Sequence, residues 1–399
     1  MKVRVPAYYK KFSCIAGECE DTCCAGWEID IDEASYGYYQ KMPGEFGDQV
    51  RGCIKEYEGS GEDGYEAHGF ILKEEKRCPF LREDGLCEMI LTLGEDAICD
   101  VCTYTPRNFL EYGGMREISI SPSCAEAGRL IFGSSEKVEF LTEEEEGELD
   151  LEESEEDILF GERIRAARDY ALGILQERER SISERMGGFL CFGKEVQQRL
   201  NQEDMEGLER LQDQEFSAYI RQAGKMGEKW GDSPDRQYLS FLKRFASFSG
   251  LDSINEEWEQ YLQDMQAIFT AGGDGEGNYR EAMEGCAFQI GKEHREFEWE
   301  QLAVYLAFLM VSRCVDDWNF WGKVQFVAAS WLFVRDMDAL RYHKKGGYTR
   351  EDRVDVMRIF AKEVEHSQDN LDYLEEEFLF EEVYSLEELL GQMKGMSQR

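Results

Sequence analysis

The pattern of apolar and polar positions in the second half of the chain is helical. Ile164, Ala167, Ala171, Ile174 and Leu175 recur at steps of three and four residues, with arginine and glutamate side chains between them. Side chains at this spacing lie on one face of an α-helix. We therefore expect an amphipathic helix here, with its apolar face turned toward a core.

Two later segments are apolar on every side. An unbroken apolar stretch runs from Leu302 to Val311, and Val324–Val334 is similar. Both are shorter than the roughly 18 apolar residues that a membrane-spanning helix needs. We predict that both are buried helices in the core of a helical domain, and we expect no membrane as a partner.

The N-terminal third has few long periodic stretches and many turns. Short strand-like pieces occur at Trp27–Ile31 and Arg116–Ile120, and Gly113-Gly114 is typical of a hairpin turn. A segment of this kind has little periodic apolar surface to bury. It would be held together by a bound metal as much as by a core.

Length and composition suggest where the domains divide. A chain of 399 residues exceeds the usual size of a single core, and ten of its thirteen cysteines lie in the first 124 residues. Eleven of the fifteen residues from Glu143 to Asp157 are acidic, which favours an exposed linker. We predict a mainly α protein with an irregular, cysteine-rich N-terminal module and few short strands: a metal-binding domain at 1–135, an acidic linker at 136–157 and a helical domain at 158–399.

Charge and the N-terminal sequence restrict the partners and the compartment. A net charge of −39 repels nucleic acid and anionic lipid, whereas a lysine-rich partner would be attracted. The first residues have no apolar stretch typical of an export signal, so we expect a cytoplasmic protein. In that reducing compartment, dense cysteines favour metal binding over disulfides.

The cysteines fall into two sequence clusters whose spacing is typical of metal ligands. The first is Cys14-x4-Cys19-x3-Cys23-Cys24, and the second comprises Cys78, Cys87, the pair Cys99-x2-Cys102, and Cys124. Closely spaced thiolates on a turn can converge on one centre, and Cys-x2-Cys is a familiar half-site. Together the clusters supply up to nine thiolates, which is enough for two sites with four ligands each.

The thiolates alone leave the metal and its stoichiometry open. Thiolate-only sets suit both structural zinc and iron–sulfur clusters. The adjacent Cys23 and Cys24 cannot easily bind one small ion, so they serve a polynuclear cluster or two different centres, or one of them binds no metal. Only His68 among the histidines lies in this region, so a mixed Cys/His site is not expected. The remaining cysteines are expected to be ordinary small apolar side chains: Cys53, Cys191, Cys286 and Cys314.

Four separated motifs resemble the flagellin lysine-N-methylase family, which shares its cysteine pattern with a broader set of zinc- or iron-chelating proteins. The matching stretches are Phe12–Trp27, Cys78–Cys87, Cys102–Arg107 and Ser119–Glu126. The resemblance implies transfer of methyl groups from S-adenosylmethionine to lysine side chains of flagellin, with an iron–sulfur cluster, expected as 4Fe-4S, or zinc as the alternative. The metal ligands it implies are Cys14, Cys19, Cys23, Cys24, Cys78, Cys87, Cys102 and Cys124.

The chain departs from the family pattern at three places. It has Cys102-Thr-Tyr-Thr-Pro-Arg107 where the family tends to have Cys-Arg-x-Tyr-Pro-Arg, and Ala125 where a proline tends to follow Cys124. Cys99 is not a fixed position of the family, so it stands apart from the eight expected ligands. The Cys-x3-Cys-x2-Cys spacing of radical S-adenosylmethionine enzymes is absent, so radical chemistry is not expected.

Catalytic residues are not evident from the sequence. Methyl transfer needs a deprotonated lysine, and Tyr104, Tyr112 and Trp27 lie near the cysteine motifs, although each is also typical of packing or surface. Arg107 or Arg129 could pair with the carboxylate of the methyl donor, or simply form a surface salt bridge. The alternative function is a non-enzymatic protein that chelates or delivers zinc or iron and binds a partner through its helical domain.

Overall fold

The computed structural model describes residues 1–57, 67–228, 234–270 and 273–394, and the chain forms two compact units. The helical unit contains residues 1–11, 109–119 and everything from Gly128 onward. The cysteine-rich unit contains Phe12–Asn108 and Ile120–Ala127. This division differs from the predicted boundary at residue 135, because two N-terminal segments group with the helices.

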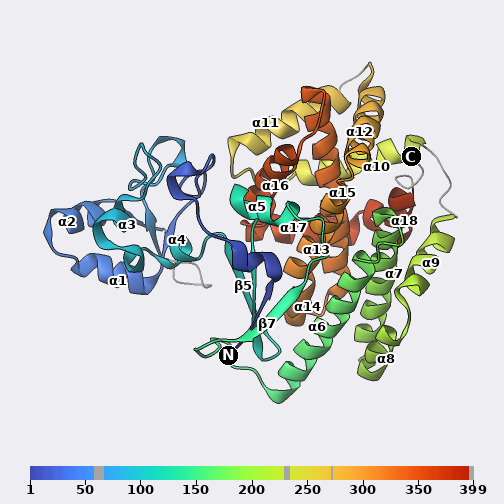
Figure 1. Ribbon diagram of the computed structural model, residues 1–399, viewed down its shortest axis with the longest axis horizontal. Helices are drawn as coiled ribbons and strands as arrows, with labels where there is room; N and C mark the ends of the chain where they lie inside the picture. The colour runs from blue at the N-terminus through green and yellow to red at the C-terminus, as the bar shows by residue number, and fades with distance from the viewer. Residues whose placement is uncertain (58–66, 229–233, 271–272, 395–399) are drawn as a thin grey trace. The chain divides into compact units, whose positions relative to one another are not determined.

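The helical unit is a bundle of α-helices joined by short connections (Figure 1). Its helices are α6 (Glu155–Leu175), α7 (Ile182–Asn201), α8 (Met205–Arg210), α9 (Phe216–Gly227), α10 (Pro234–Ser249), α11 (Glu256–Met265), α12 (Gly275–Lys292), α13 (Phe297–Met310), α14 (Cys314–Asp317), α15 (Phe320–Lys345), α16 (Arg350–Val364), α17 (Gln368–Phe380) and α18 (Leu386–Lys394). The prediction of a mainly helical protein with few short strands is confirmed.

The long helix α15 forms the centre of this bundle. It contacts α7, α12, α13, α16 and α17, and all its residues from Phe320 to Leu340 are buried. Both predicted buried segments, Leu302–Val311 and Val324–Val334, lie in this core. A helix covered on all sides has no solvent-exposed face, so most of its buried positions are apolar and its few buried polar residues need partners within the core.

Helix α6 begins where the sequence has a capping motif. The Ser154 side chain accepts a hydrogen bond from the Asp157 backbone, and the Asp157 carboxylate accepts one from the Ser154 backbone. Ile164 and the four other residues of the predicted apolar face are all fully buried, so that prediction is confirmed. The same reciprocal cap begins α7 at Ser181 and α16 at Thr349.

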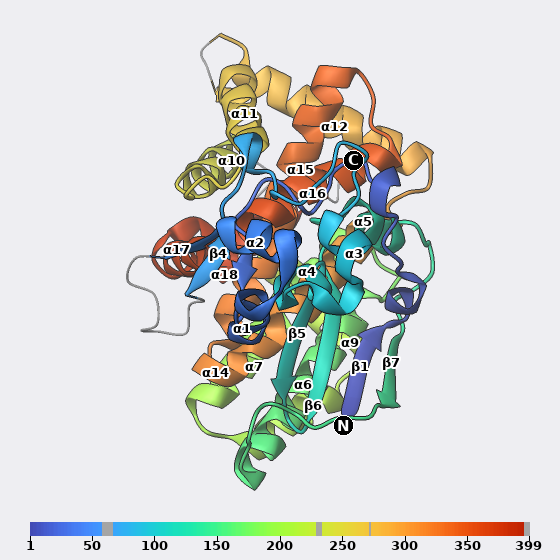
Figure 2. The same cartoon turned by 90° about the vertical axis from the view of Figure 1, so that its left-hand side faces the viewer.

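A four-stranded sheet completes the helical unit (Figure 2). Its order is β5 (Arg107–Tyr112), β6 (Met115–Ile120), β1 (Lys2–Pro6) and β7 (Phe140–Glu144), with β1 parallel to β6 and antiparallel to β7. Val3 lies opposite both Arg116 and Glu143. The N-terminal strand thus groups with the helical unit because it is paired on both sides.

The sheet corrects the expectation of an acidic linker at 136–157. Strand β7 lies inside that segment, and Phe140 stacks on Phe308 of α13 with ring centroids 4.7 Å apart. Glu153 accepts hydrogen bonds from the backbone of Gly113 and Gly114, at 2.7 and 2.9 Å. The acidic run therefore forms part of a strand, caps a turn and begins a helix. Most of its side chains are exposed to solvent, which weakens the repulsion between their negative charges.

The predicted hairpin turn at Gly113-Gly114 connects β5 and β6. Both glycines have a positive φ, 57° and 69°, which side chains rarely tolerate. A Cβ on Gly161 of α6 would come within 2.6 Å of the Gly113 backbone. Because neither Gly113 nor Gly161 has a side chain, α6 can pack directly on the turn.

The cysteine-rich unit is built from short elements. Strands β2 (Asp30–Ile31), β4 (His68–Phe70) and β3 (Ile54–Glu56) form a small antiparallel sheet in that order. The helices are α1 (Glu33–Lys41), α2 (Gly44–Gly52), α3 (Glu88–Leu93) and α4 (Asp100–Tyr104), while α5 (Ala125–Phe132) spans the boundary between units. The predicted strand at Trp27–Ile31 is present only at its end, and Arg116–Ile120 lies within β6.

Throughout the described ranges, each helix is too short or too polar to cross a bilayer.

Candidate functional site

All eight cysteines predicted as metal ligands lie in the cysteine-rich unit. They fall into two adjoining groups of neighbouring thiols, which meet at Cys23 and Cys24. We name them the outer group (Cys14, Cys19, Cys23 and Cys124) and the inner group (Cys24, Cys78, Cys87, Cys99 and Cys102). Thiols of the same group are related by hydrogen bonds, by common apolar packing or by the effect of one thiol's charge on the pKa of another.

The outer group lies on two loops. Cys14 and Cys19 flank a single turn of 3-10 helix at Ala16–Glu18, and the Ala16 backbone donates a hydrogen bond of 3.4 Å to the Cys14 sulfur. Cys124, just before α5, is brought to them by the return of the chain after β6. Burial, together with the charges of Cys19 and Cys14, raises the pKa of Cys124.

Cys23 belongs to the outer group and Cys24 to the inner group. The two thiols share a hydrogen bond, which raises the pKa of Cys23 and lowers that of Cys24. Cys23 also feels the charges of Cys14 and Cys124. Cys24 acts instead on the inner thiols, including Cys78. Of the three roles left open for this adjacent pair, the arrangement favours ligation of two different centres.

The inner group is embedded in the apolar core of the unit, beside Phe70, Phe80 and Met89. The Cys78 backbone donates a 2.8 Å hydrogen bond to the Cys24 carbonyl, so the two sequence clusters are joined directly. Burial raises the pKa of Cys78 to about 12, with the charges of Cys24 and Cys87 adding to the effect. A thiol whose pKa is raised by burial, such as Cys78, favours its protonated form unless a cation replaces the proton.

Cys99 lies beside Cys102, with their sulfur atoms 3.6 Å apart. Cys99 is buried and directly precedes α4, whereas Cys102 lies one turn further along that helix. The expected ligand set omitted Cys99 because the family resemblance did not include it. The Cys-x2-Cys spacing was the signal that could have placed it in the group.

The thiols are not arranged as a completed metal site. Among the residues that the structure describes, no three histidine, cysteine or acidic side chains are positioned to hold one ion. His68 stacks on Tyr36, with ring centroids 3.5 Å apart. The chemistry of the donors nevertheless fits a thiolate-bound metal, since each group offers four or more sulfur atoms.

The other cysteines are placed as small apolar side chains. Cys53 is half-buried at the edge of the apolar core of the cysteine-rich unit, while Cys191, Cys286 and Cys314 are buried in the helical unit. Burial raises the pKa of Cys191 to about 12.

The candidate catalytic residues near the cysteine motifs have structural partners. The Tyr112 hydroxyl lies 2.8 Å from Ser312 Oγ in the core, and burial raises the pKa of Tyr112. Arg129 forms an ion pair with Glu351 at 3.1 Å, and the Arg107 guanidinium lies 5.4 Å from the centre of the Phe12 ring. For Arg129 the structure favours the surface salt bridge.

Buried charges in the helical unit link its helices. Asp336 on α15 accepts hydrogen bonds from Arg244 on α10 and Tyr279 on α12, at 2.7 and 2.9 Å. Two residues along, Asp338 pairs with Arg353 on α16 at 2.7 Å. Burial raises the pKa of both aspartates, and the arginines oppose this. These buried ion pairs help to determine which helices pack against α15.

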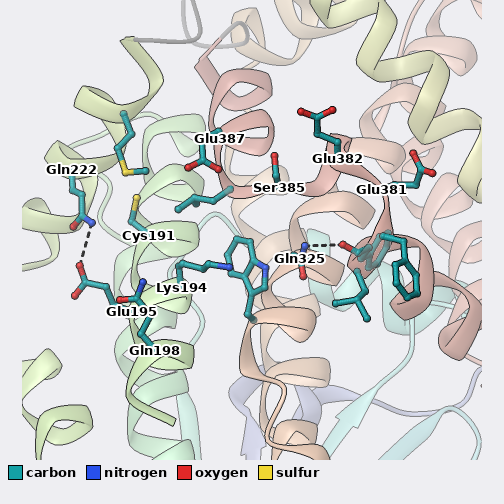
Figure 3. A pocket seen from close by; sticks show the side chains of 16 residues that line it. Cys191, Lys194, Glu195, Gln198, Gln222, Gln325, Glu381, Glu382, Ser385 and Glu387 are labelled. Carbon is teal, nitrogen blue, oxygen red and sulfur yellow. Dashed lines mark hydrogen bonds between the residues drawn. The ribbon is translucent and has the colours of Figure 1, made fainter. Parts of the chain in front are cut away.

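The helical unit also contains a cavity of about 560 Å³, bordered by α7, α9, α15, α17 and the start of α18 (Figure 3). Lys194 and Glu195 line it from α7, Trp321 from α15, Phe378 from α17, and Glu387 from α18. The Lys194 ammonium lies 4.5 Å from the centre of the Trp321 ring. This site has no local signal in the sequence, because its lining comes from helices distant in the chain.

Comparison with known proteins identifies one family of methylases. The family of FliB lysine N-methylase C-terminal domains matches residues 168–392. The chain is similar to a lysine-N-methylase of Salmonella typhimurium (28% identical over 137 residues, 31% of each protein) and to the flagellar biosynthetic protein FliU of Salmonella muenchen (30% over 127 residues, 31% of this chain and 73% of FliU). The chain spans about a third of the length of the lysine-N-methylases it matches. No solved structure matches.

Proposed function

The chain belongs to the FliB lysine N-methylase C-terminal domain family, and from this membership we propose that it transfers methyl groups from S-adenosylmethionine to lysine side chains of flagellin. The observation that carries the proposal is the length of the match. It runs from α6 to α18 and covers more than half of the chain. The cysteine motifs in the other unit support the same family independently.

The reaction sets clear chemical demands. The lysine nitrogen attacks the methyl carbon of the sulfonium, the carbon–sulfur bond breaks as the carbon–nitrogen bond forms, and the ammonium product loses a proton. A free lysine has a pKa of about 10.4, so the site must lower that pKa or supply a base. Alignment of the amine with the methyl group and exclusion of water supply the rest of the acceleration.

We also propose that the thiol groups bind an iron–sulfur cluster, with zinc as the alternative metal. Cys14, Cys19, Cys23 and Cys124 would form one ligand set, and Cys24, Cys78, Cys87 and Cys102, with Cys99, the other. When bound, such a cluster cross-links segments that are far apart in the sequence and replaces the protons of buried thiols. The inner group is supported most strongly, because it lies in the core of its unit.

Flagellin is proposed as the substrate and the cytoplasm, before export, as the compartment. The acidic surface of a chain with net charge −39 favours encounter with lysine-rich surfaces. Exposed charges are screened over about 8 Å at physiological ionic strength, so selection of the amine must be local.

Co-expression with flagellin tests the activity. Flagellin made with the active protein should carry lysines heavier by the mass of one methyl group, and flagellin made alone should not. Unmodified flagellin beside metal-loaded protein and ample S-adenosylmethionine would contradict the methylase assignment. In that case a colourless, zinc-loaded protein that does not bind the donor would support the chelating alternative.

Cysteine variants test the metal proposal separately. Anaerobic purification followed by iron, zinc and sulfide analysis should give a brown protein with about four irons for each cluster. Cys23→Ala and Cys102→Ala should each lower the metal content. Cys53→Ala is the matched control, because Cys53 lies in the same unit and outside both groups. Equal metal content in all three variants would contradict the assigned ligands.

A further inference from the structure

The cavity in the helical unit has the chemistry of a cation-binding site. Four carboxylates line it, from Glu195, Glu381, Glu382 and Glu387, against one ammonium group, from Lys194. Trp321 and Phe378 supply aromatic walls. Its volume is within the range of pockets that enclose small ligands or side chains.

The aromatic wall already carries an ammonium group of the protein itself. Lys194 extends from α7 toward the Trp321 ring, and Figure 3 shows it directed into the centre of the cavity. Burial lowers the pKa of Lys194, while Glu387 opposes this shift. Because Trp321 is nearly buried, its ring face is a site where an ammonium is partly removed from water and cation–π attraction is strengthened.

The rim of the cavity is suited to a protein surface. Leu379 and Phe380, at the end of α17, line the cavity and are each 73% exposed. Exposed apolar side chains beside a pocket are typical of protein-binding surfaces. Glu381 and Glu382 follow directly and add negative charge to the same rim.

We propose that this cavity is a lysine pocket, which binds the side chain of a substrate lysine while the apolar rim contacts the polypeptide around it. This inference rests on the proposed methylase function and locates the amine-binding part of that function. Trp321 receives the ammonium, and Glu195 and Glu387 balance its charge. Lys194 acts as an internal competitor for the ring face, and the substrate amine displaces it.

Peptide binding tests the lysine pocket without requiring methyl transfer. The probe is a fluorescein-labelled ten-residue peptide with one central lysine among serine and alanine residues, and the matched peptide carries acetyl-lysine. Fluorescence anisotropy should show that acetylation, which removes the charge, abolishes most of the binding. The double variant Glu195→Gln/Glu387→Gln should weaken binding of the lysine peptide about tenfold.

Two further variants make the test specific. Lys194→Met should tighten peptide binding, because it removes the competing ammonium. Glu376→Gln is the matched control, since Glu376 is exposed on α17 and outside the cavity lining; it should change binding less than about twofold. Thermal unfolding confirms that each variant is folded.

Three outcomes would overturn the proposal. They are unchanged peptide binding in the double variant, an equal loss in Glu376→Gln, or weakened binding of S-adenosylmethionine while peptide binding is retained, which would make the cavity the donor site. Specific peptide binding together with unmethylated flagellin would count against the proposed function alone.

Discussion

The helical unit buries whole helices, whereas the cysteine-rich unit buries only isolated side chains between short elements. Helix α15 alone has 21 consecutive buried residues. The apolar core of the cysteine-rich unit contains eleven buried residues among those the structure describes, and two of these are cysteines. A core of that size gives marginal stability, so the two units should respond differently to the same perturbation. The difference teaches that the metal proposed for the two thiol groups would stabilise the cysteine-rich unit and not the helical unit.

If the proposed metal is bound, its removal should have the largest effect. Anaerobic treatment with a strong chelator should make the cysteine-rich unit cleavable by a protease at least about 100-fold faster, because thiolate-bound metal contributes about 10 kcal/mol or more in small metal domains. Mass spectrometry of the fragments gives the measurement. The region 168–392 should remain protected from cleavage. Equal cleavage rates in the two units would contradict the expected difference in their response to metal removal.

A substitution that creates a void in the helical core should have the next largest effect. Phe333 on α15 is fully buried and stacks on Phe248, with ring centroids 4.1 Å apart. Phe333→Ala should lower the free energy of unfolding by about 4 kcal/mol in urea denaturation, because the void cannot be refilled. Leu379→Ala, at an exposed position, should change it by less than about 0.5 kcal/mol. Metal content should be the same in both variants.

The next largest effect is expected from the loss of a buried ion pair that joins the sheet to the helices. Arg168 on α6 is fully buried, donates to Glu117 on β6 at 2.8 Å, and also donates to Ser312 at 2.9 Å. Arg168→Met should destabilise the helical unit by about 3 kcal/mol, because it removes the close hydrogen bonds to the buried Glu117 carboxylate and leaves the longer ion pair with Arg4, at 3.8 Å.

The double variant Arg168→Met/Glu117→Met sharpens this result. It removes both charges, so urea denaturation should show a smaller loss than the single variant. A double variant that is as unstable as the sum of two independent losses would show that packing, not charge, dominates at this position.

The smallest effect is expected from the loss of a carboxylate that holds the acidic segment, and its contribution to stability should depend on pH. Glu111 on β5 accepts hydrogen bonds from the backbone of Asp150 and Leu151, at 2.7 and 2.9 Å, and from Arg116. Burial raises the pKa of Glu111, but these donors outweigh it and lower the pKa below its ordinary value. The ionised carboxylate therefore stabilises the fold above the ordinary pKa of about 4.3, and this contribution is lost as the pH falls through and below that value.

Glu111→Gln should accordingly lower the free energy of unfolding by about 1 kcal/mol at pH 7 and by less near pH 3. Urea denaturation at both pH values provides the measurement. A difference that does not change with pH would mean that the negative charge of Glu111 does not contribute to holding the acidic segment.

The helices could be predicted from sequence because their signal is local. The apolar spacing from Ile164 to Leu175 and the apolar stretches of α13 and α15 identify helices and their buried faces directly, since side chains three and four residues apart share a face whatever lies opposite. The cysteine motifs and the turn at Gly113-Gly114 could be recognised in the sequence for the same reason. Each depends on a few neighbouring residues.

The tertiary structure decided which distant segments meet. The strand at Lys2–Pro6 lies between β6 and β7, so the unit boundary predicted at residue 135 could not be read from composition. Cys23 and Cys24 are adjacent in sequence but belong to different thiol groups, and Cys99 joins a group that resemblance alone had not assigned to it. The cavity around Trp321 likewise collects side chains from five helices. Local patterns specify the faces of elements, but partners between elements depend on long-range packing, which no short window of sequence contains.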